Sequence, residues 1–213
     1  MSSTVSGGDQ YIHGDDNSKR QNILNQLFWP SSHAAFSQSG IVQRASAKIA
    51  QPFRLLEIGC GAGLSTLSLA KALPNNVHIT AIDASEQLIA SAQSNPEYDQ
   101  DLQKRVEFKV SSGESLLASS DYCYYKEYFD AVWLRFVLIH VPDPIALLRA
   151  ARDCLVDSGM LLVEDTDAAS GWVSDPPFLA NDFLHKAHAE LSRKLGADVE
   201  RGRMIGRFMK EIG

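Results

Sequence analysis

One stretch, Arg54–Ser65, constrains the fold of this chain more than any other. It reads Arg-Leu-Leu-Glu-Ile-Gly-Cys-Gly-Ala-Gly-Leu-Ser: an apolar run with an acidic residue near its end, glycines at alternate positions, and the start of a helical pattern. Glycine takes positive φ angles without strain and lets a backbone approach a ligand closely. The stretch therefore predicts a strand, a tight turn and a helix N-terminus that together admit a nucleotide-like ligand.

The chain beyond this stretch continues to alternate between strand-like and helix-like patterns. Helical patterns alternate with apolar runs that read as strands, at about residues 53–58, 77–82, 106–110, 129–134 and 160–164. Alternating strands and helices predict right-handed crossovers and a parallel sheet with helices on both faces. We therefore expect an α/β fold with a doubly wound, mainly parallel sheet. Ligands of such sheets bind at the carboxyl ends of the strands.

The segment before the first strand differs in character. Residues 1–8 are mostly small and polar, which predicts a loose tail. Two helical patterns follow, over about 18–29 and 33–50, and Pro30 and Pro52 are expected to end them. We therefore expect two parts: a tail with N-terminal cover helices in residues 1–52, and a nucleotide-binding core in residues 53–213.

Charge and cysteine content exclude several classes of function. The formal net charge of −6 and the pI near 5.5 argue against a nucleic-acid-binding surface. The three cysteines, Cys60, Cys123 and Cys154, are odd in number and far apart, so they predict a reducing compartment without a disulfide framework. No signal pattern and no apolar run of membrane-spanning length occurs. We expect a soluble, cytoplasmic protein that binds neither membrane nor nucleic acid.

The glycine spacing and two carboxylates distinguish between nucleotides. Dinucleotide sites use Gly-x-Gly-x-x-Gly, with a pyrophosphate at the helix N-terminus. Here Gly59, Gly61 and Gly63 follow Gly-x-Gly-x-Gly, and Glu57 stands just ahead of them, where it would repel a pyrophosphate but suit an ammonium group. Asp83 ends the second strand, where a carboxylate accepts hydrogen bonds from ribose hydroxyls. Both carboxylates fit an adenosine that carries a cationic amino-acid tail.

Several segments in order resemble the class I S-adenosylmethionine (SAM)-dependent methyltransferases. Leu56–Gly63 is similar to their first motif, Ile79–Asp83 to their ribose-binding strand, Phe129–Asp143 to their fourth strand and its loop, and Leu147–Glu164 to the helix and strand that follow. The resemblance covers about residues 11–213. It implies a Rossmann-like fold and methyl transfer from S-adenosyl-L-methionine to a small-molecule acceptor, with S-adenosyl-L-homocysteine as the product.

The resemblance also implies a cofactor site. Glu57 would bind the amino end of the cofactor, Asp83 the ribose diol, and Ala84 the adenine. Tyr11 and Arg20 would close over the cofactor carboxylate from the N-terminal cover. Ser112 stands where many relatives carry an acidic residue against the adenine amine. The expected contact residues are Tyr11, Arg20, Glu57, Gly59, Cys60, Gly61, Gly63, Asp83, Ala84, Ser112, Gly113, Glu114, Leu134 and Arg135.

The sequence offers one candidate general base. A sulfonium donor is already activated, so the protein mainly positions the reactants, and a base is needed only when the acceptor keeps its proton. His140 follows the fourth strand and can titrate near neutrality, although a structural role, in which it hydrogen-bonds the Val-Pro turn after it, is the favoured interpretation. Glu164, Asp165 and Asp167 leave the fifth strand at the same edge, either to face the substrate or to cap loops.

For other reactive or bulky side chains, a structural role has to be weighed against a functional one. Cys60 lies at a helix N-terminus, which can lower a thiol pKa, but packing is the favoured interpretation. His185 and His188 share a helical face without an evident third ligand, so we expect an ordinary helix surface and no metal. Phe36 is expected in the core, and Trp172 in the wall of an apolar acceptor pocket.

Two rival functions and one structural question stay open. The rivals are a catalytically inactive SAM-binding partner or regulatory subunit and, less favoured, an NAD-dependent oxidoreductase. The family's sheet normally finishes with an antiparallel strand pair after the last helices, and this sequence stops where that pair would begin. Strand five would then be an exposed edge. Either the sequence is truncated, or a second copy or a partner chain covers that edge.

Overall fold

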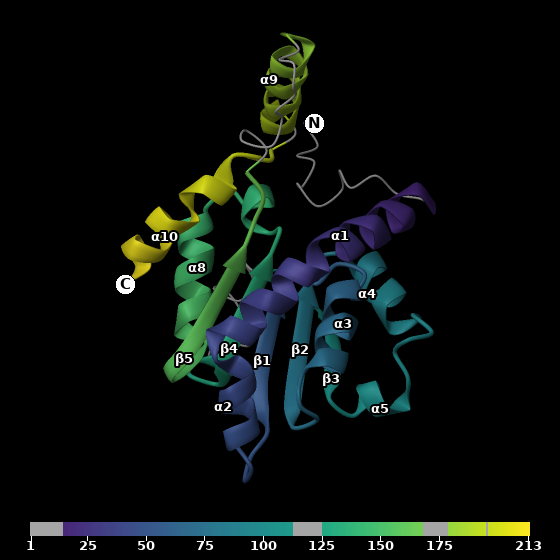
Figure 1. Ribbon diagram of the computed structural model, residues 1–213, viewed down its shortest axis with the longest axis vertical. Helices are drawn as coiled ribbons and strands as arrows, with labels where there is room; N and C mark the ends of the chain where they lie inside the picture. The colour runs from purple at the N-terminus through teal and green to yellow at the C-terminus, as the bar shows by residue number, and fades with distance from the viewer. Residues whose placement is uncertain (1–14, 113–124, 168–178, 195) are drawn as a thin grey trace, which may run out of the picture.

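A five-stranded sheet forms the centre of the molecule, with strand order β3-β2-β1-β4-β5 (Figure 1). The computed structural model describes residues 15–112, 125–167, 179–194 and 196–213. All four strand pairs are parallel. The predicted doubly wound α/β fold is therefore confirmed. The strands are β1 (Phe53–Ile58), β2 (Val77–Asp83), β3 (Val106–Val110), β4 (Phe129–Arg135) and β5 (Leu155–Glu164).

Helices cover both faces of this sheet. One apolar cluster joins the sheet to α1, α2, α3 and α4, and a second joins the other face to α8 and α10. Because the sheet is sandwiched, β1 sends Leu55 to the first cluster and Leu56 to the second. The helices are α1 (Asp15–Ser39), α2 (Ile41–Ala47), α3 (Leu64–Ala72), α4 (Glu86–Gln93), α5 (Gln100–Gln103), α8 (Pro144–Asp153), α9 (Leu179–Lys194) and α10 (Ile205–Ile212).

The N-terminal cover departs from the prediction of two helices separated at Pro30. The single helix α1 continues through Pro30 and ends at Ser39, before Gly40 with φ +84°. A proline inside a helix removes one backbone donor and crowds the preceding turn. Here the Ser31 hydroxyl donates to the Phe28 carbonyl at 2.9 Å, and the Ser32 oxygen lies 3.2 Å from the same carbonyl. The helix thus continues past the proline and ends only at the glycine.

Strand β5 starts at Leu155, earlier than the expected residue 160, because residues 157–159 lie inside it as a bulge. Phe129 pairs with Leu155 and Ala131 with Met160, so two steps along β4 match five along β5. Ser158 in the bulge has φ +61°. The register is regular again from Met160, which brings Glu164 beside Arg135 at the carboxyl edge, the edge where the strands end.

Candidate functional site

The glycine loop between β1 and α3 forms as predicted. Gly59, Gly61 and Gly63 all have positive φ angles, of +77°, +56° and +75°. A Cβ atom at Gly59 would lie 2.5 Å from Val137 Cγ2, and one at Gly63 would lie 2.7 Å from Phe108 Cζ. A Cβ at Gly61 would meet nothing within 4 Å. Two glycines are therefore required by packing, whereas the third faces open space.

Asp83 organises this loop from the end of β2. Its Oδ2 accepts a 2.8 Å hydrogen bond from the Gly61 amide, and its Oδ1 accepts a 2.9 Å bond from the Ser85 amide. Each carboxylate oxygen has two acceptor sites, so both oxygens can still accept from a ligand hydroxyl. Asp83 thus lies at the strand end where ribose recognition was predicted, and it also fixes the loop.

Glu57 is the most buried charged residue of the site, with 1% of its surface exposed. Ser65 Oγ donates to its Oε1 at 2.8 Å, whereas its Oε2 is buried without a hydrogen-bond partner among the described residues. Burial raises the pKa of this carboxyl, and nearby hydroxyls together with the Arg135 guanidinium act in the opposite direction. A buried, unpartnered carboxylate oxygen is costly unless a cationic or donor group meets it. The residue therefore fits the ammonium end of the expected cofactor.

Arg135 ends β4 next to these acids and is 8% exposed. Its Nη1 donates to Asn25 Oδ1 of α1 at 2.9 Å, and its buried Nε lacks a partner among the described residues. Burial lowers the pKa of its guanidinium, while Glu164 and Glu57 raise it. Leu134, which was also expected at the cofactor, is fully buried in the second cluster. Any contact from Leu134 to a ligand would come from its backbone.

The cover helix α1 packs on one face of the sheet and is bonded to the carboxyl ends of the strands by polar side chains. Asn25 Nδ2 donates to Ser68 Oγ of α3 at 3.3 Å. Ser32 Oγ donates to Glu164 Oε2 at 2.7 Å, and Trp133 Nε1 donates to Glu164 Oε1 at 3.2 Å. Sequence reasoning missed Asn25 and Ser32. Their signal was a polar residue within the apolar side of a helix.

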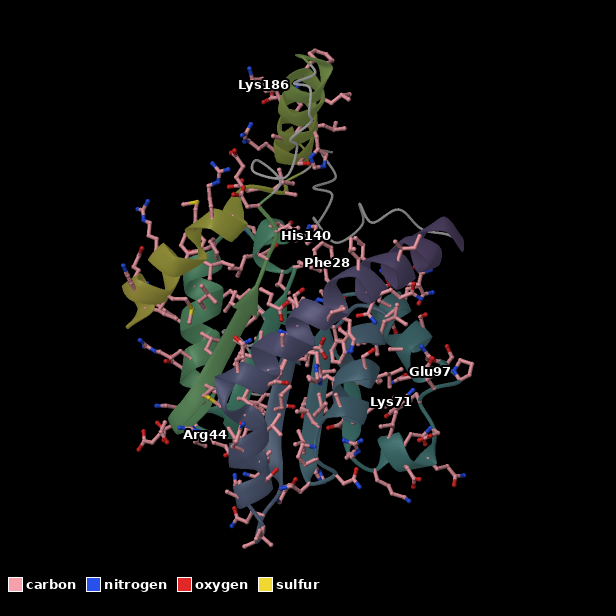
Figure 2. The ribbon with its side chains drawn as sticks, viewed as in Figure 1. Phe28, Arg44, Lys71, Glu97, His140 and Lys186 are labelled. Carbon is pink, nitrogen blue, oxygen red and sulfur yellow. The ribbon has the colours of Figure 1, made fainter. Side chains whose placement is uncertain are left out.

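The acidic residues at the end of β5 and just after it all make contacts within the fold. Glu164 binds the cover helix, Asp165 accepts a 3.2 Å hydrogen bond from the Ile139 amide, and Asp167 pairs with Arg203 at 3.0 Å. All three therefore have structural contacts. His140 is exposed and ends the 3₁₀ turn η2 (Leu138–His140), which follows β4 (Figure 2).

The remaining residues predicted from the sequence differ in burial, and several lie outside the described part of the chain. Cys60 is buried, and this burial raises its thiol pKa well above the usual value, in agreement with a packing role. Ala84 is exposed just after β2, and Ser112 is half-buried just after β3. Phe36 lies in the core, edge-on to Trp133. Tyr11, Gly113, Glu114 and Trp172 lie outside the described residues, as do the side chains of Arg20 and His185.

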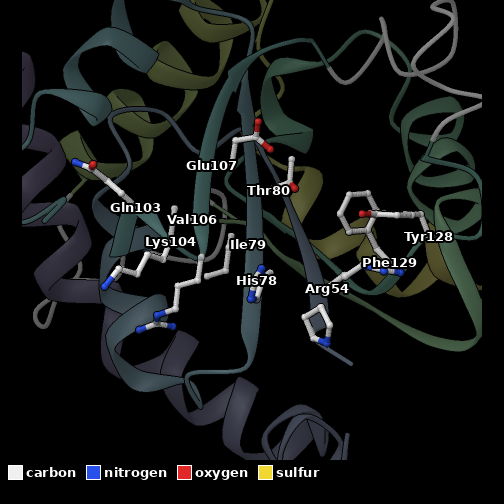
Figure 3. A pocket seen from close by; sticks show the side chains of 12 residues that line it. Arg54, His78, Ile79, Thr80, Gln103, Lys104, Val106, Glu107, Tyr128 and Phe129 are labelled. Carbon is white, nitrogen blue, oxygen red and sulfur yellow. The ribbon is translucent and has the colours of Figure 1, made fainter. Parts of the chain in front are cut away.

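A separate cavity of about 310 Å³ opens at the opposite end of the sheet (Figure 3). Arg54, His78, Glu107 and Tyr128 contribute to its lining, and the Arg54 guanidinium lies 4.3 Å from the centroid of the Tyr128 ring. The cavity includes none of the predicted cofactor residues, so it is distinct from the glycine-loop site. Among the described residues, no group of three His, Cys, Asp or Glu side chains could hold a metal ion. No helix in that same part of the chain is long and apolar enough to cross a membrane.

Comparison with known proteins identifies the family. A family model described as a methyltransferase domain matches residues 33–211. The chain therefore belongs to the methyltransferase-domain family. The predicted membership of the class I SAM-dependent methyltransferases is confirmed by this match together with the parallel sheet.

Individual relatives give the same class. A ubiquinone biosynthesis O-methyltransferase of Xanthomonas campestris is 33% identical over 119 residues, which are 55% of this chain and 45% of that protein. The chain thus spans about half the length of the curated relatives it matches. A candidate methyltransferase from Bacillus halodurans has a TM-score of 0.59 at 19% identity, covering 86% of this chain and 68% of that one. A phosphoethanolamine N-methyltransferase of Haemonchus contortus, solved with S-adenosyl-L-methionine, has a TM-score of 0.54 at 18% identity, covering 84% and 36%. These two structures support the fold.

Proposed function

We propose that this chain is a SAM-dependent methyltransferase that acts on a small-molecule acceptor and releases S-adenosyl-L-homocysteine. The observation that carries the proposal is the buried, unpartnered Oε2 of Glu57 beside the glycine loop. A carboxylate at this place suits an ammonium group and disfavours a pyrophosphate, which argues for a cationic adenosyl ligand over NAD. Membership of the methyltransferase-domain family supports the same reaction class.

In this proposal each residue of the site has a defined task. S-adenosyl-L-methionine, when bound, supplies a methyl group that its sulfonium centre already activates. Glu57 holds the ammonium, Asp83 accepts from the ribose hydroxyls, and Gly61 leaves room for close approach. The cover helix keeps water from the carboxyl edge, because its Asn25 and Ser32 side chains bind it to β4, β5 and α3.

We propose a hydroxyl as the acceptor group. The names of the curated relatives, ubiquinone biosynthesis O-methyltransferases, support an oxygen acceptor. Transfer to a hydroxyl requires removal of its proton, which His140 would take onto an imidazole nitrogen. The exposure of His140 on the turn after β4 fits this task.

Further parts of the proposal concern the organisation of the chain. Residues 1–52 would act as the cover and residues 53–213 as the core, with Tyr11 and Arg20 closing on the cofactor carboxylate. A second copy or a partner chain would cover the outer edge of β5, since β5 is the last strand of the sheet among the described residues. The free, buried Cys60 and Cys154 fit a cytoplasmic location.

The deciding experiment has two stages. Calorimetry with S-adenosyl-L-methionine, S-adenosyl-L-homocysteine and NAD should give binding of the first two and none of NAD. Methyl-labelled cofactor should then transfer label to a phenol or catechol from a panel that also holds amines and thiols. Binding of NAD alone would favour an oxidoreductase. Tight cofactor binding with no transfer to any acceptor would favour a regulatory, non-catalytic subunit.

A further inference from the structure

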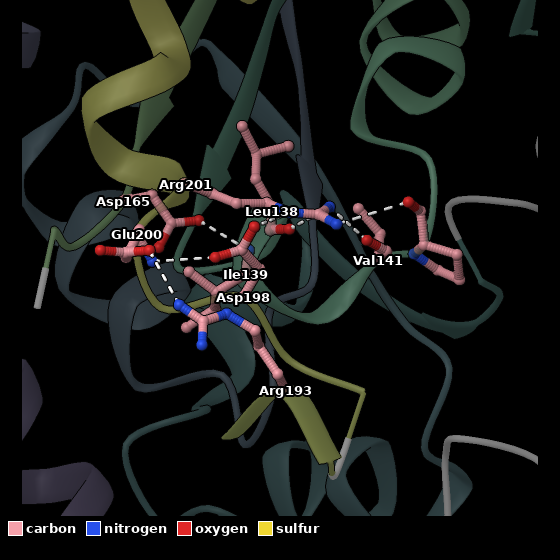
Figure 4. Close-up of polar contacts among 9 residues, drawn as sticks. Leu138, Ile139, Val141, Asp165, Arg193, Asp198, Glu200 and Arg201 are labelled. Carbon is pink, nitrogen blue, oxygen red and sulfur yellow. Dashed lines mark hydrogen bonds and ion pairs between the residues drawn. The ribbon is translucent and has the colours of Figure 1, made fainter. Parts of the chain in front are cut away.

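The turn that carries His140 is held by residues distant in sequence (Figure 4). This turn, Leu138–Pro142, follows β4. The residues that hold it are Asp165, just after β5, Asp198, which precedes the 3₁₀ turn η3 (Arg201–Met204), and Arg201, the first residue of η3. These contacts are separate from the glycine loop, and none of them binds the expected cofactor residues.

Arg201 holds the carbonyl side of the turn. Its Nη1 donates to the Leu138 carbonyl at 3.0 Å and also to the Val141 carbonyl, and its Nη2 donates to the Pro142 carbonyl at 3.4 Å. The backbone amide of Asp198 donates to the Ile139 carbonyl at 2.8 Å. A guanidinium presents several donors in a rigid, planar fork, so one side chain can fix several carbonyls at once.

Asp165 holds the amide side of the same turn. Its Oδ2 accepts from the Ile139 amide at 3.2 Å, and its Oδ1 accepts from the Thr166 amide at 2.8 Å. The Arg201 guanidinium on the opposite segment favours the ionised form of this carboxylate, whereas burial acts more strongly in the other direction. The turn is thus bonded on both its donors and its acceptors.

The segment that carries Arg201 is itself fixed against the chain after β5. The Gly202 amide donates to the Thr166 carbonyl at 3.1 Å. A Cβ atom at Gly202 would lie 2.5 Å from the Thr166 carbonyl carbon and oxygen. Close approach of these two backbones therefore sets the position from which Arg201 reaches the turn.

We propose that Arg201 and Asp165 are positioning residues that hold His140 in place for proton transfer from the methyl acceptor. This inference rests on the proposed function of His140 as a base. It links the segment after α9 to the reacting centre, and it predicts that Arg201 acts on catalysis only through His140. Misplacement of a catalytic group by about 1 Å can cost on the order of 100-fold in rate.

The first test measures the turn without catalysis. Amide hydrogen exchange at residues 138–141 is compared in the wild type, Arg201→Gln, Asp165→Asn and Arg207→Gln, which changes an exposed arginine of α10. We expect at least about 10-fold faster exchange in the first two variants and no change in Arg207→Gln. Equal exchange in all four proteins would overturn the proposal. If Arg201→Gln does not fold, Arg201→Lys and Asp165→Asn decide it.

The second test measures catalysis with whichever acceptor takes the label. Arg201→Gln should lower kcat about 10-fold or more and leave S-adenosyl-L-homocysteine affinity within about twofold. In a His140→Gln background the same change should have no further effect, because both substitutions remove one function. Additive losses would overturn the positioning role. If no acceptor is methylated, the proposed function fails, while the exchange measurement still decides whether the turn is held.

Discussion

Ser32 of the cover helix donates a 2.7 Å hydrogen bond to Glu164 at the end of β5, 132 residues further along the chain. Ser32 is fully buried, and the other carboxylate oxygen of Glu164 accepts from Trp133 Nε1 at 3.2 Å. The N-terminal helix and the last strand of the sheet are therefore joined through one carboxylate. This joint holds α1 over the carboxyl edge, where the proposed cofactor binds.

Removing the Ser32 hydroxyl should weaken the attachment of α1 to β5. Ser32→Ala removes the Ser32 hydroxyl that donates to Glu164 Oε2, so we expect a loss of about 1–3 kcal/mol in the free energy of unfolding. Urea denaturation measures it. Ser31→Ala is the matched control, because exposed Ser31 donates only to the Phe28 carbonyl, and it should change stability by less than about 0.5 kcal/mol. Equal losses of stability in both variants would contradict a stabilising role for the hydrogen bond between Ser32 and Glu164.

Glu57→Gln should separate recognition of the amino-acid tail from recognition of adenosine. We expect S-adenosyl-L-homocysteine affinity to fall about 10- to 100-fold, because the variant lacks the negative charge for the ammonium. Adenosine, which has no ammonium, should bind equally to both proteins. Calorimetry with the two ligands tests this. The assignment of Glu57 is wrong if adenosine affinity falls as much as that of S-adenosyl-L-homocysteine.

The glycines of the loop should differ in their response to alanine. Gly63→Ala places a Cβ 2.7 Å from Phe108 Cζ at a positive φ, so we expect at least about 2 kcal/mol of destabilisation. Gly61→Ala meets no atom within 4 Å and should cost only about 1 kcal/mol, from its φ of +56°. Thermal unfolding compares them. Gly61→Ala should instead weaken cofactor binding, since its Cβ would face the ligand. Similar melting temperatures for both variants would argue against this packing.

Asp165 should make stability depend on pH in a defined direction. Burial raises the pKa of this carboxyl from 3.8 to about 6, so the folded state binds its proton more tightly than the unfolded state does. Its contribution to stability is therefore fully present below 3.8 and is lost as the pH rises through about 6.

Asp165→Asn removes this titration. The stability of the wild type relative to the variant should rise by about 1 kcal/mol between pH 7 and pH 5. Urea unfolding of both proteins at the two pH values measures the difference. A constant difference, or one that shrinks as the pH falls, would show that burial does not govern this carboxyl.

The local parts of the fold and site were predictable from the sequence because their determinants lie close together in the chain. Glu57 and Asp83 lie on two neighbouring strands and the glycine loop follows the first of them, and the strand-helix alternation predicts a parallel sheet that brings their carboxyl ends together. The continuity of α1 through Pro30 was not predictable, since proline normally ends a helix and the packing that overrides it is tertiary.

The long-range polar contacts could not be predicted for a related reason. The bond from Arg135 to Asn25 spans 110 residues, and that from Arg201 to the Leu138 carbonyl spans 63. Hydrophobic periodicity reports which side of an element is buried, but it does not pair individual polar groups across the fold. Phe136, with φ +58° directly after β4, likewise carried no sequence signal.

The double role of Asp83 has an evolutionary consequence. The carboxylate proposed to recognise the sugar also holds the Gly61 and Ser85 amides, so it shapes the loop on which the cofactor rests. A lineage that replaced Asp83 to accept a different sugar would at the same step alter the backbone of that loop. If Asp83 binds the sugar as proposed, ligand preference and loop geometry cannot change independently at this position.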